Sequence, residues 1–116
     1  MLYSIGKNLT AGQSNTLFTV PTGYHAQVTY IRIANTGGST ASISASWHYD
    51  GTEIIFQGTN SVGGGGVIEF QDNYGPFLVM RDGDYITATP QAGSSFSIVV
   101  TFDLIKHDAS NFNLTN

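Results

Sequence analysis

The stretch that decides the fold is Thr40–Tyr49, with the sequence TASISASWHY, and it continues directly into Asp50-Gly51. Apolar side chains stand at every odd position from Ala41 to Tyr49, and hydroxyl or imidazole side chains stand at the even positions. A period of two residues is typical of a half-buried antiparallel strand. Asp-Gly is a strong hairpin signal. We therefore expect a strand that turns at Asp50-Gly51 and returns as Thr52–Gln57.

A second alternating ladder lies near the end of the chain, in Ser95–Ile105. Its apolar side chains share one face: Phe96, Ile98, Val100, Phe102 and Leu104. Small side chains on the first ladder, such as Ala41 and Ala45, leave room for large ones on the second. We expect the two ladders to face each other and to form the centre of the core.

The remaining apolar runs are short and are separated by turn residues every 8–12 positions, a spacing typical of a β-sandwich. In Tyr24–Asn35 the inward set changes parity, from Ala26 and Val28 to Ile31 and Ile33, so we expect a β-bulge near residues 29–30. The sequence predicts an all-β fold, a single antiparallel β-sandwich (jelly-roll or Ig-like) of about eight or nine strands. The other expected strands are Leu2–Ile5, Asn15–Val20, Val67–Phe70, Phe77–Met80 and Tyr85–Pro90.

We expect one domain over residues 1–116, with polar arms at 1–14 and 107–116. Such arms bury little surface by themselves, so we expect them to become ordered against a neighbouring subunit. The opening residues lack the pattern of a signal peptide, and no apolar run approaches the roughly 20 residues of a membrane span. We therefore expect no membrane partner.

Composition excludes several classes of function. Lys and Arg together number 4 against 8 acidic residues, which gives a formal net charge of −4. Four scattered cations cannot line a nucleic-acid groove, so we expect no nucleic-acid partner. The chain has no cysteine, which excludes a disulfide scaffold, a thiolate zinc site and a thiol nucleophile.

No motif points to catalysis, a metal or a cofactor, and we expect none of the three. His25, His48 and His107 are not at ligand spacing, and no serine lies in a nucleophile-elbow motif. The carboxylates lack calcium-loop spacing, so we expect Asp82-Gly83 to form a turn and Asp84 to cap a strand. Gly63–Gly66 precedes a strand pattern rather than a helix, so it predicts a flexible surface loop rather than a phosphate loop.

Aromatic side chains leave two hypotheses open. Trp47 has core parity, although an exposed tryptophan would instead offer a flat face to a sugar ring. Tyrosine is enriched at protein interfaces. We expect contacts through the N-terminal arm, the 58–66 loop and the C-terminal tail, with these interface residues: Tyr3, Gly64, Gly65, Tyr74, Tyr85, Asn111 and Phe112.

Two segments carry a resemblance to a known group. Leu17–Tyr24 (LFTVPTGY), continued by the alternation up to Thr36, and Gly75–Ile86 (GPFLVMRDGDYI) resemble small β-sandwich virion structural proteins of tailed bacteriophages, which act as decoration (cement) or tail-associated proteins. The resemblance implies a virion β-sandwich and carries no catalytic residues across.

With this resemblance, we expect a capsid decoration protein that binds and stabilises the capsid shell as an oligomer, with a trimer preferred. Its partners would be further copies of itself and the major capsid protein or other virion proteins. It would be made in the host cytoplasm and reside in the virion. The alternatives are a tail or head–tail component, and a carbohydrate- or receptor-binding module.

Overall fold

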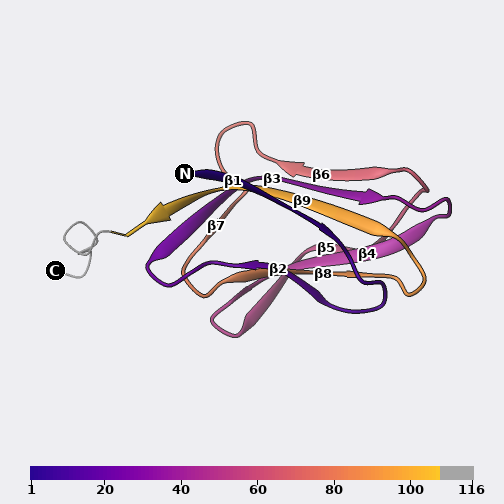
Figure 1. Ribbon diagram of the computed structural model, residues 1–116, viewed down its shortest axis with the longest axis horizontal. Coiled ribbons are helices and arrows are strands. Elements are labelled where there is room, and N and C mark those ends of the chain that lie inside the picture. Colours follow the sequence, from indigo (N-terminus) through magenta and orange to yellow (C-terminus); the bar gives the residue numbers. More distant parts are fainter. Residues whose placement is uncertain (108–116) are drawn as a thin grey trace.

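The computed structural model describes residues 1–107, and these residues contain strands and turns but no helix (Figure 1). No segment of this described part is therefore a helix that could span a membrane. The strands follow one another along the chain as β1 (Leu2–Asn8), β2 (Asn15–Thr19), β3 (Tyr24–Asn35), β4 (Ala41–Tyr49), β5 (Thr52–Val62), β6 (Val67–Gln71), β7 (Leu78–Met80), β8 (Tyr85–Pro90) and β9 (Phe96–Lys106).

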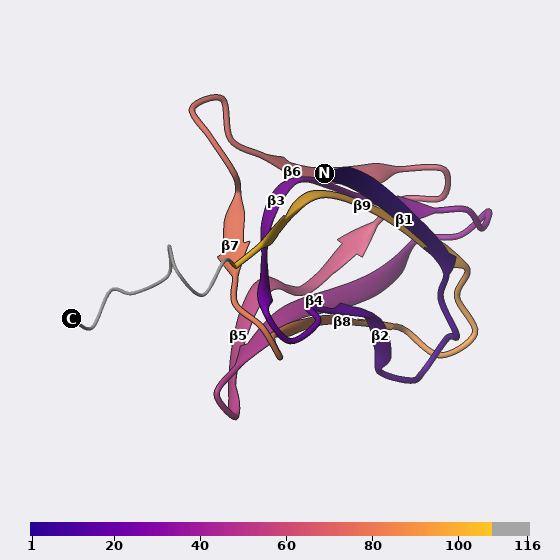
Figure 2. The same ribbon diagram turned by 60° about the vertical axis from the view of Figure 1, so that its left-hand side comes forward.

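The strands form two packed antiparallel sheets (Figure 2). The five-stranded sheet has the order β1-β9-β3-β6, with β7 also paired to β3, and the four-stranded sheet has the order β2-β8-β4-β5. The pairs are nested along the chain: β4 with β5, β3 with β6, β2 with β8, and β1 with β9. This nesting is the winding of a jelly roll. The predicted β-sandwich is confirmed, and its topology is the jelly roll rather than the Ig-like arrangement.

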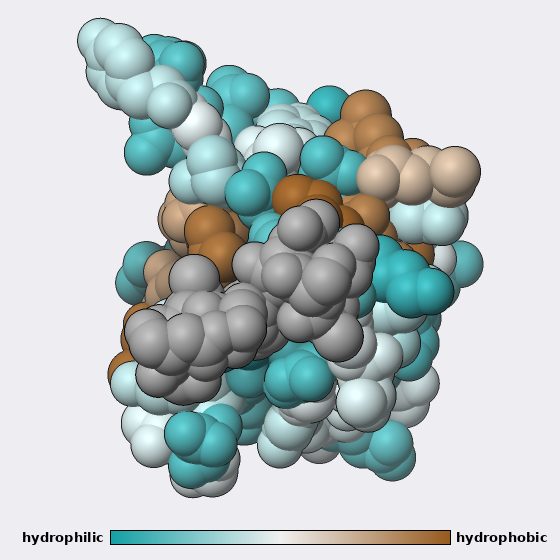
Figure 3. Space-filling model, turned by 90° about the vertical axis from the view of Figure 1, so that its left-hand side faces the viewer, coloured by the Kyte–Doolittle hydropathy of each residue, from teal (hydrophilic) through white to brown (hydrophobic). Residues whose placement is uncertain are grey.

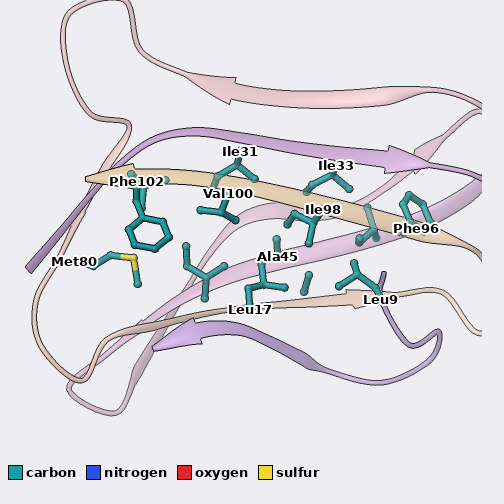
Figure 4. Packing of buried hydrophobic residues seen from close by; sticks show 14 of the residues in the cluster. Leu9, Leu17, Ile31, Ile33, Ala45, Met80, Phe96, Ile98, Val100 and Phe102 are labelled. Carbon is teal, nitrogen blue, oxygen red and sulfur yellow. The ribbon is translucent and has the colours of Figure 1, made fainter. Parts of the chain in front are cut away.

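The core lies between the two predicted ladders (Figure 4). From the four-stranded sheet, Ala41, Ile43 and Ala45 are buried, and from the five-stranded sheet the side chains from Phe96 to Phe102 on one face of β9 are buried. The alternation of β4 and β9 therefore turns both ladders towards the core between the two sheets, as predicted. Trp47 is half-buried at the end of its ladder.

The predicted bulge in β3 is present. Val28 pairs with Phe102 and Tyr30 pairs with Thr101, so Thr29 is the extra residue. This one-residue insertion lets Ala26 and Val28 before it, and Ile31 beyond it, all point into the core.

The Asp50-Gly51 hairpin is confirmed, but its returning strand is longer than expected. Both turn residues have positive φ, 50° and 75°, as a type I′ turn requires. The sequence predicted a return over Thr52–Gln57, whereas β5 continues to Val62. Two irregularities in the β4–β5 register absorb extra residues of β5, so that Asn60–Val62 pairs with the start of β4.

The expectation for the N-terminal arm is wrong. Instead of a short strand at Leu2–Ile5 in an arm that needs a neighbouring subunit, β1 pairs with β9 over its whole length, Leu2–Asn8. The arm is then fixed by Leu9, which is buried and donates a backbone hydrogen bond to Phe96 O. Backbone hydrogen bonds to the free edge of β9 stabilise a strand whose side chains bury little. The predicted C-terminal arm, apart from His107, lies outside the described residues.

Candidate functional site

Two of the three histidines, which are not at ligand spacing in the sequence, come together in the fold. His25 Nδ1 lies 2.9 Å from His107 Nε2, because the start of β3 pairs with the end of β9. His48 lies apart from them, with Nε2 2.8 Å from Thr87 Oγ1. Over residues 1–107, no three His, Asp or Glu side chains converge in a way that could hold a metal ion.

Asp84 caps the start of β8, as predicted. Its Oδ2 accepts a hydrogen bond from the backbone N–H of Arg81 at 3.0 Å and another from Trp47 Nε1 at 3.2 Å. The turn before it is closed by Gly83, which has a φ of 85°. This buried carboxylate therefore ties the tryptophan of β4 to the β7–β8 turn, and the indole ring stacks on Tyr49 with a centroid distance of 4.6 Å.

The described surface contains hollows at two places next to turns. One, of about 150 Å³, is lined by Tyr49, Asp50, Arg81, Asp82 and Asp84. The other, of about 220 Å³, lies between residues 35–41 and 91–95 and is lined by Gly, Ser, Thr, Ala, Asn and Gln side chains or backbone. Both linings offer hydrogen-bonding groups, and neither contains a serine or cysteine beside a histidine. Each can hold a small polar group.

The predicted contact residues Gly64 and Gly65 lie in a tight turn rather than in a flexible loop. Gly65 N donates to Asn35 O, and Asn35 N donates to Gly66 O, both at 2.9 Å. A Cβ atom on Gly64 would lie 2.6 Å from the backbone carbon of Gly38. Glycine at position 64 is thus required by a close approach of two backbone segments, which sequence reasoning missed.

The three predicted tyrosines lie in different places. Tyr3 on β1 stacks on Phe102 with a centroid distance of 5.8 Å. Tyr85 stacks on His48 at 4.4 Å on the outer face of the four-stranded sheet. Tyr74 lies in the turn between β6 and β7 that projects from the body (Figure 2), and its side chain is 98% exposed. Asn111 and Phe112 lie outside the described residues.

Exposed apolar side chains gather on the strands at the sheet edges. Tyr3 and Leu2 lie on β1, and Ile54 and Ile55 lie on β5, where Ile55 is 62% exposed. Val67 on β6 is exposed too. The end of the molecule at which β9 terminates also shows apolar patches among hydrophilic ones (Figure 3). The adjacent isoleucines were a signal in the sequence, because an alternating strand cannot bury both.

Aromatic clusters close both open sides of the sandwich. On the β1/β2 side, Phe18 stacks on Phe102 at 4.4 Å, beside Tyr3. On the β5/β6 side, the rings of Phe56, Phe70 and Phe77 contact one another with centroid distances of 5.3 to 5.7 Å. All these residues except Phe102 are partly exposed, so each side presents an aromatic seam between two edge strands.

No protein-family model matches the chain, and a search of curated proteins found no match. Solved structures do share the fold. A protein of Bacillus endospore appendages, which form disulfide-linked pili, is 12% identical with a TM-score of 0.58, and the match covers 93% of this chain and 88% of that one. A protein of the T13 particle of infectious bursal disease virus is 10% identical with a TM-score of 0.50. That match covers 92% of this chain and 35% of the viral one.

Proposed function

We propose that this chain is a structural protein of a tailed-bacteriophage virion, and specifically a capsid decoration protein that acts by binding rather than by catalysis. The observation that carries the proposal is the contrast between its interior and its edges. Residues 1–107 bring together no three side chains that could hold a metal ion, whereas the edge strands β1, β5 and β6 expose apolar side chains. Exposed strand edges are templates for pairing with another chain.

The resemblance of Leu17–Thr36 and Gly75–Ile86 to phage virion proteins supports a phage particle as the place where the chain acts. The jelly roll shared with a pilus protein and a viral-particle protein fits the same kind of role. In this proposal several copies, three in the preferred form, bind across junctions between capsid subunits. Non-covalent contacts through the exposed edges and the projecting turn at Tyr74 would hold the shell against internal pressure.

The copy number of the chain in purified virions tests the proposal. Quantitative mass spectrometry against the major capsid protein would give hundreds of copies for a decoration protein. A handful of copies would replace the decoration role by a tail or head–tail role. Complete absence from the particles would contradict the virion role.

A carbohydrate-binding role is the second candidate, because one observation favours it. The hollow of about 150 Å³ is lined by Tyr49 together with the charged residues Asp50, Arg81 and Asp82, and an aromatic side chain beside polar groups offers an apolar face and hydrogen-bonding partners to a sugar. A glycan array supports this role if it gives hits that Tyr49→Ala abolishes and Tyr74→Ala leaves unchanged. An array without hits removes it.

A further inference from the structure

We propose that copies of this chain join edge to edge, with β1 of one copy pairing with β6 of the next, so that the five-stranded sheet runs continuously through the assembly. This inference rests on the proposed structural role and names the partner of the exposed edges as a second copy of the chain. Four features of β1, β6 and their surroundings carry it: strand direction, free backbone groups, the aromatic seams and charge.

Strand direction is the first argument. The path β1-β9-β3-β6 contains four strands, and each neighbour is antiparallel to the last. With an even number of strands, β6 runs opposite to β1. When a second copy is placed beside the first in the same orientation, its β1 is therefore antiparallel to β6 of the first. Repeated addition preserves the alternation of the whole sheet without turning any copy over.

Free backbone groups are the second argument. Met1 and Leu104 exchange backbone hydrogen bonds of 3.0 and 2.8 Å, so antiparallel alternation directs the N–H and C=O groups of Leu2, Ser4, Gly6 and Asn8 away from β9. Likewise, Asn35 N donates to Gly66 O. The same alternation then directs the backbone groups of Val67, Glu69 and Gln71 away from β3.

These outward groups lie at matching heights across the sheet. Ser4 is level with Gln71 through the pairs Ser4–Thr101, Thr101–Tyr30 and Tyr30–Gln71. The same three strand registers place Gly6 level with Glu69, and Asn8 level with Val67. If two copies lie side by side without a shift along the strands, the outward N–H and C=O groups of β1 in one copy face those of β6 in the other. Both strands are also regular over these residues, whereas the β5 edge is broken by register shifts.

The aromatic seams are the third argument. Lys7 Nζ donates to Thr16 O at 3.1 Å, which joins β1 to β2 on one side of the sandwich. Phe56 contacts Phe70, which joins β5 to β6 on the other side. Edge-to-edge contact would therefore place the seam of Tyr3 and Phe18 against the seam of the three phenylalanines and cover both partly exposed clusters.

Charge is the fourth argument, and it selects the second copy as the occupant. The edge strands β1 and β2 carry Lys7 and no carboxylate side chain, whereas β5 and β6 carry Glu53 and Glu69 and no cation. A symmetric β6–β6 contact centred on Glu69 would place two Glu69 side chains opposite each other. The β1–β6 contact avoids this repulsion. A head-to-tail contact of this kind builds a ring when the rotation closes and a filament when it does not.

Cysteine cross-linking tests the pairing directly, because the chain has no cysteine of its own. The single variants Ser4→Cys and Gln71→Cys are oxidised separately and as a mixture, and the products are identified by mass. Within one copy the two positions are three strand spacings apart, about 14 Å, so a bond between them joins two copies. We expect the mixture to give the mixed dimer in large excess over either variant alone.

The matched control is Thr89→Cys, an exposed position on the central strand β8, which should stay uncross-linked with either edge variant. Self-linked Ser4→Cys in amounts equal to the mixed dimer would overturn the proposal in favour of a β1–β1 contact. A mixture without mixed dimer, at a concentration where the wild-type protein is oligomeric, would overturn it too, while leaving a structural role by other surfaces intact.

A second pair of variants tests the free edge itself. Ser4→Pro removes an outward N–H, whereas Ser4→Ala removes the hydroxyl contact with Thr101 and keeps that N–H. We expect Ser4→Pro to associate only at a protein concentration at least about tenfold higher than Ser4→Ala needs. Its circular dichroism spectrum should be unchanged. Equal association of the two folded variants would overturn the proposal. If the mixed dimer forms but the chain is absent from purified virions, the virion role is contradicted and the edge pairing is still supported.

Discussion

Trp47 Nε1 donates a hydrogen bond of 3.2 Å to Oδ2 of Asp84, although the two residues are 37 positions apart in the chain. The same oxygen accepts the backbone N–H of Arg81. One buried carboxylate oxygen thus holds the end of the β4 ladder, the β7–β8 turn and the start of β8 together. This oxygen explains why a half-buried tryptophan stays in a fixed position at the end of the sandwich.

Replacement of this carboxylate should destabilise the fold. In Asp84→Ala the indole N–H and the Arg81 N–H lose their acceptor in a buried place, and we expect a loss of about 2–3 kcal/mol in the free energy of unfolding. Urea unfolding followed by Trp47 fluorescence measures it. Asp82→Ala, which removes one exposed contact of 3.3 Å to Gly23 N, should cost less than about 1 kcal/mol. Equal stability of the two variants would show that the buried contacts contribute nothing.

Two neighbouring glycines should respond very differently to an added methyl group. A Cβ at Gly64 would lie 2.6 Å from the Gly38 backbone carbon, whereas a Cβ at Gly63 would meet nothing within 4 Å. We expect Gly64→Ala to lose about 1–3 kcal/mol of stability and Gly63→Ala to stay within about 0.5 kcal/mol of wild type. Thermal unfolding compares them. A Gly64→Ala protein as stable as Gly63→Ala would mean that the two turns do not touch.

Asn35 should be one of the most sensitive polar residues. Its Nδ2 donates to Ser39 O at 2.8 Å and to Val62 O at 2.9 Å, and its Oδ1 accepts from Gly37 N at 3.0 Å. Because the side chain is only 1% exposed, we expect Asn35→Ala to cost about 2–4 kcal/mol in chemical unfolding. Asn73→Ala, in the exposed turn after β6, is the control and should be neutral. A neutral Asn35→Ala would contradict the account of how this end of the sandwich is closed.

Alkaline titration should reveal the contact between Tyr30 and Glu69. The Tyr30 hydroxyl donates to the Glu69 carboxylate, and this hydrogen bond raises the pKa of Tyr30 above the usual value of about 10. The folded protein then holds this proton where the unfolded chain would release it, so the contribution is complete below about pH 10 and is lost as the pH rises through the raised pKa.

Absorbance at 295 nm follows tyrosinate formation by the six tyrosines. Tyr30→Phe should remove a late-titrating component, and Tyr74→Phe should leave that component in place. If Tyr30→Phe and Tyr74→Phe both lose the late-titrating component, the contact with Glu69 does not raise the pKa of Tyr30.

Local alternation accounts for the parts of the fold that sequence predicted well. The Ala41–Tyr49 and Phe96–Phe102 ladders, the Asp50-Gly51 turn and the bulge at Thr29 each follow from the period of two residues or from a change in its parity. Each of these features is encoded within about a dozen residues. The register shifts of β5 are set by its pairing with β4, so the continuation to Val62 could not be read from β5 alone.

The features that define the candidate surface depend on strands distant in the sequence. Edge status is a property of the sheet order, which places β1 and β6 at the margins of one sheet. The pairing of β1 with β9, the His25–His107 contact and the approach of Gly64 to Gly38 all join segments at least 26 residues apart. Sequence patterning indicated which residues are apolar, but not which strand would be left without a neighbour.

The mass of the protein in solution tests the central claim, that this jelly roll works by associating through its exposed surfaces. Analytical ultracentrifugation over a range from low micromolar to millimolar concentration should show species larger than the 12.4 kDa chain, increasing with concentration. Ser4→Pro should shift this association to higher concentration. A strictly monomeric wild-type protein over the whole range would contradict self-association and remove the basis for the edge-to-edge assembly.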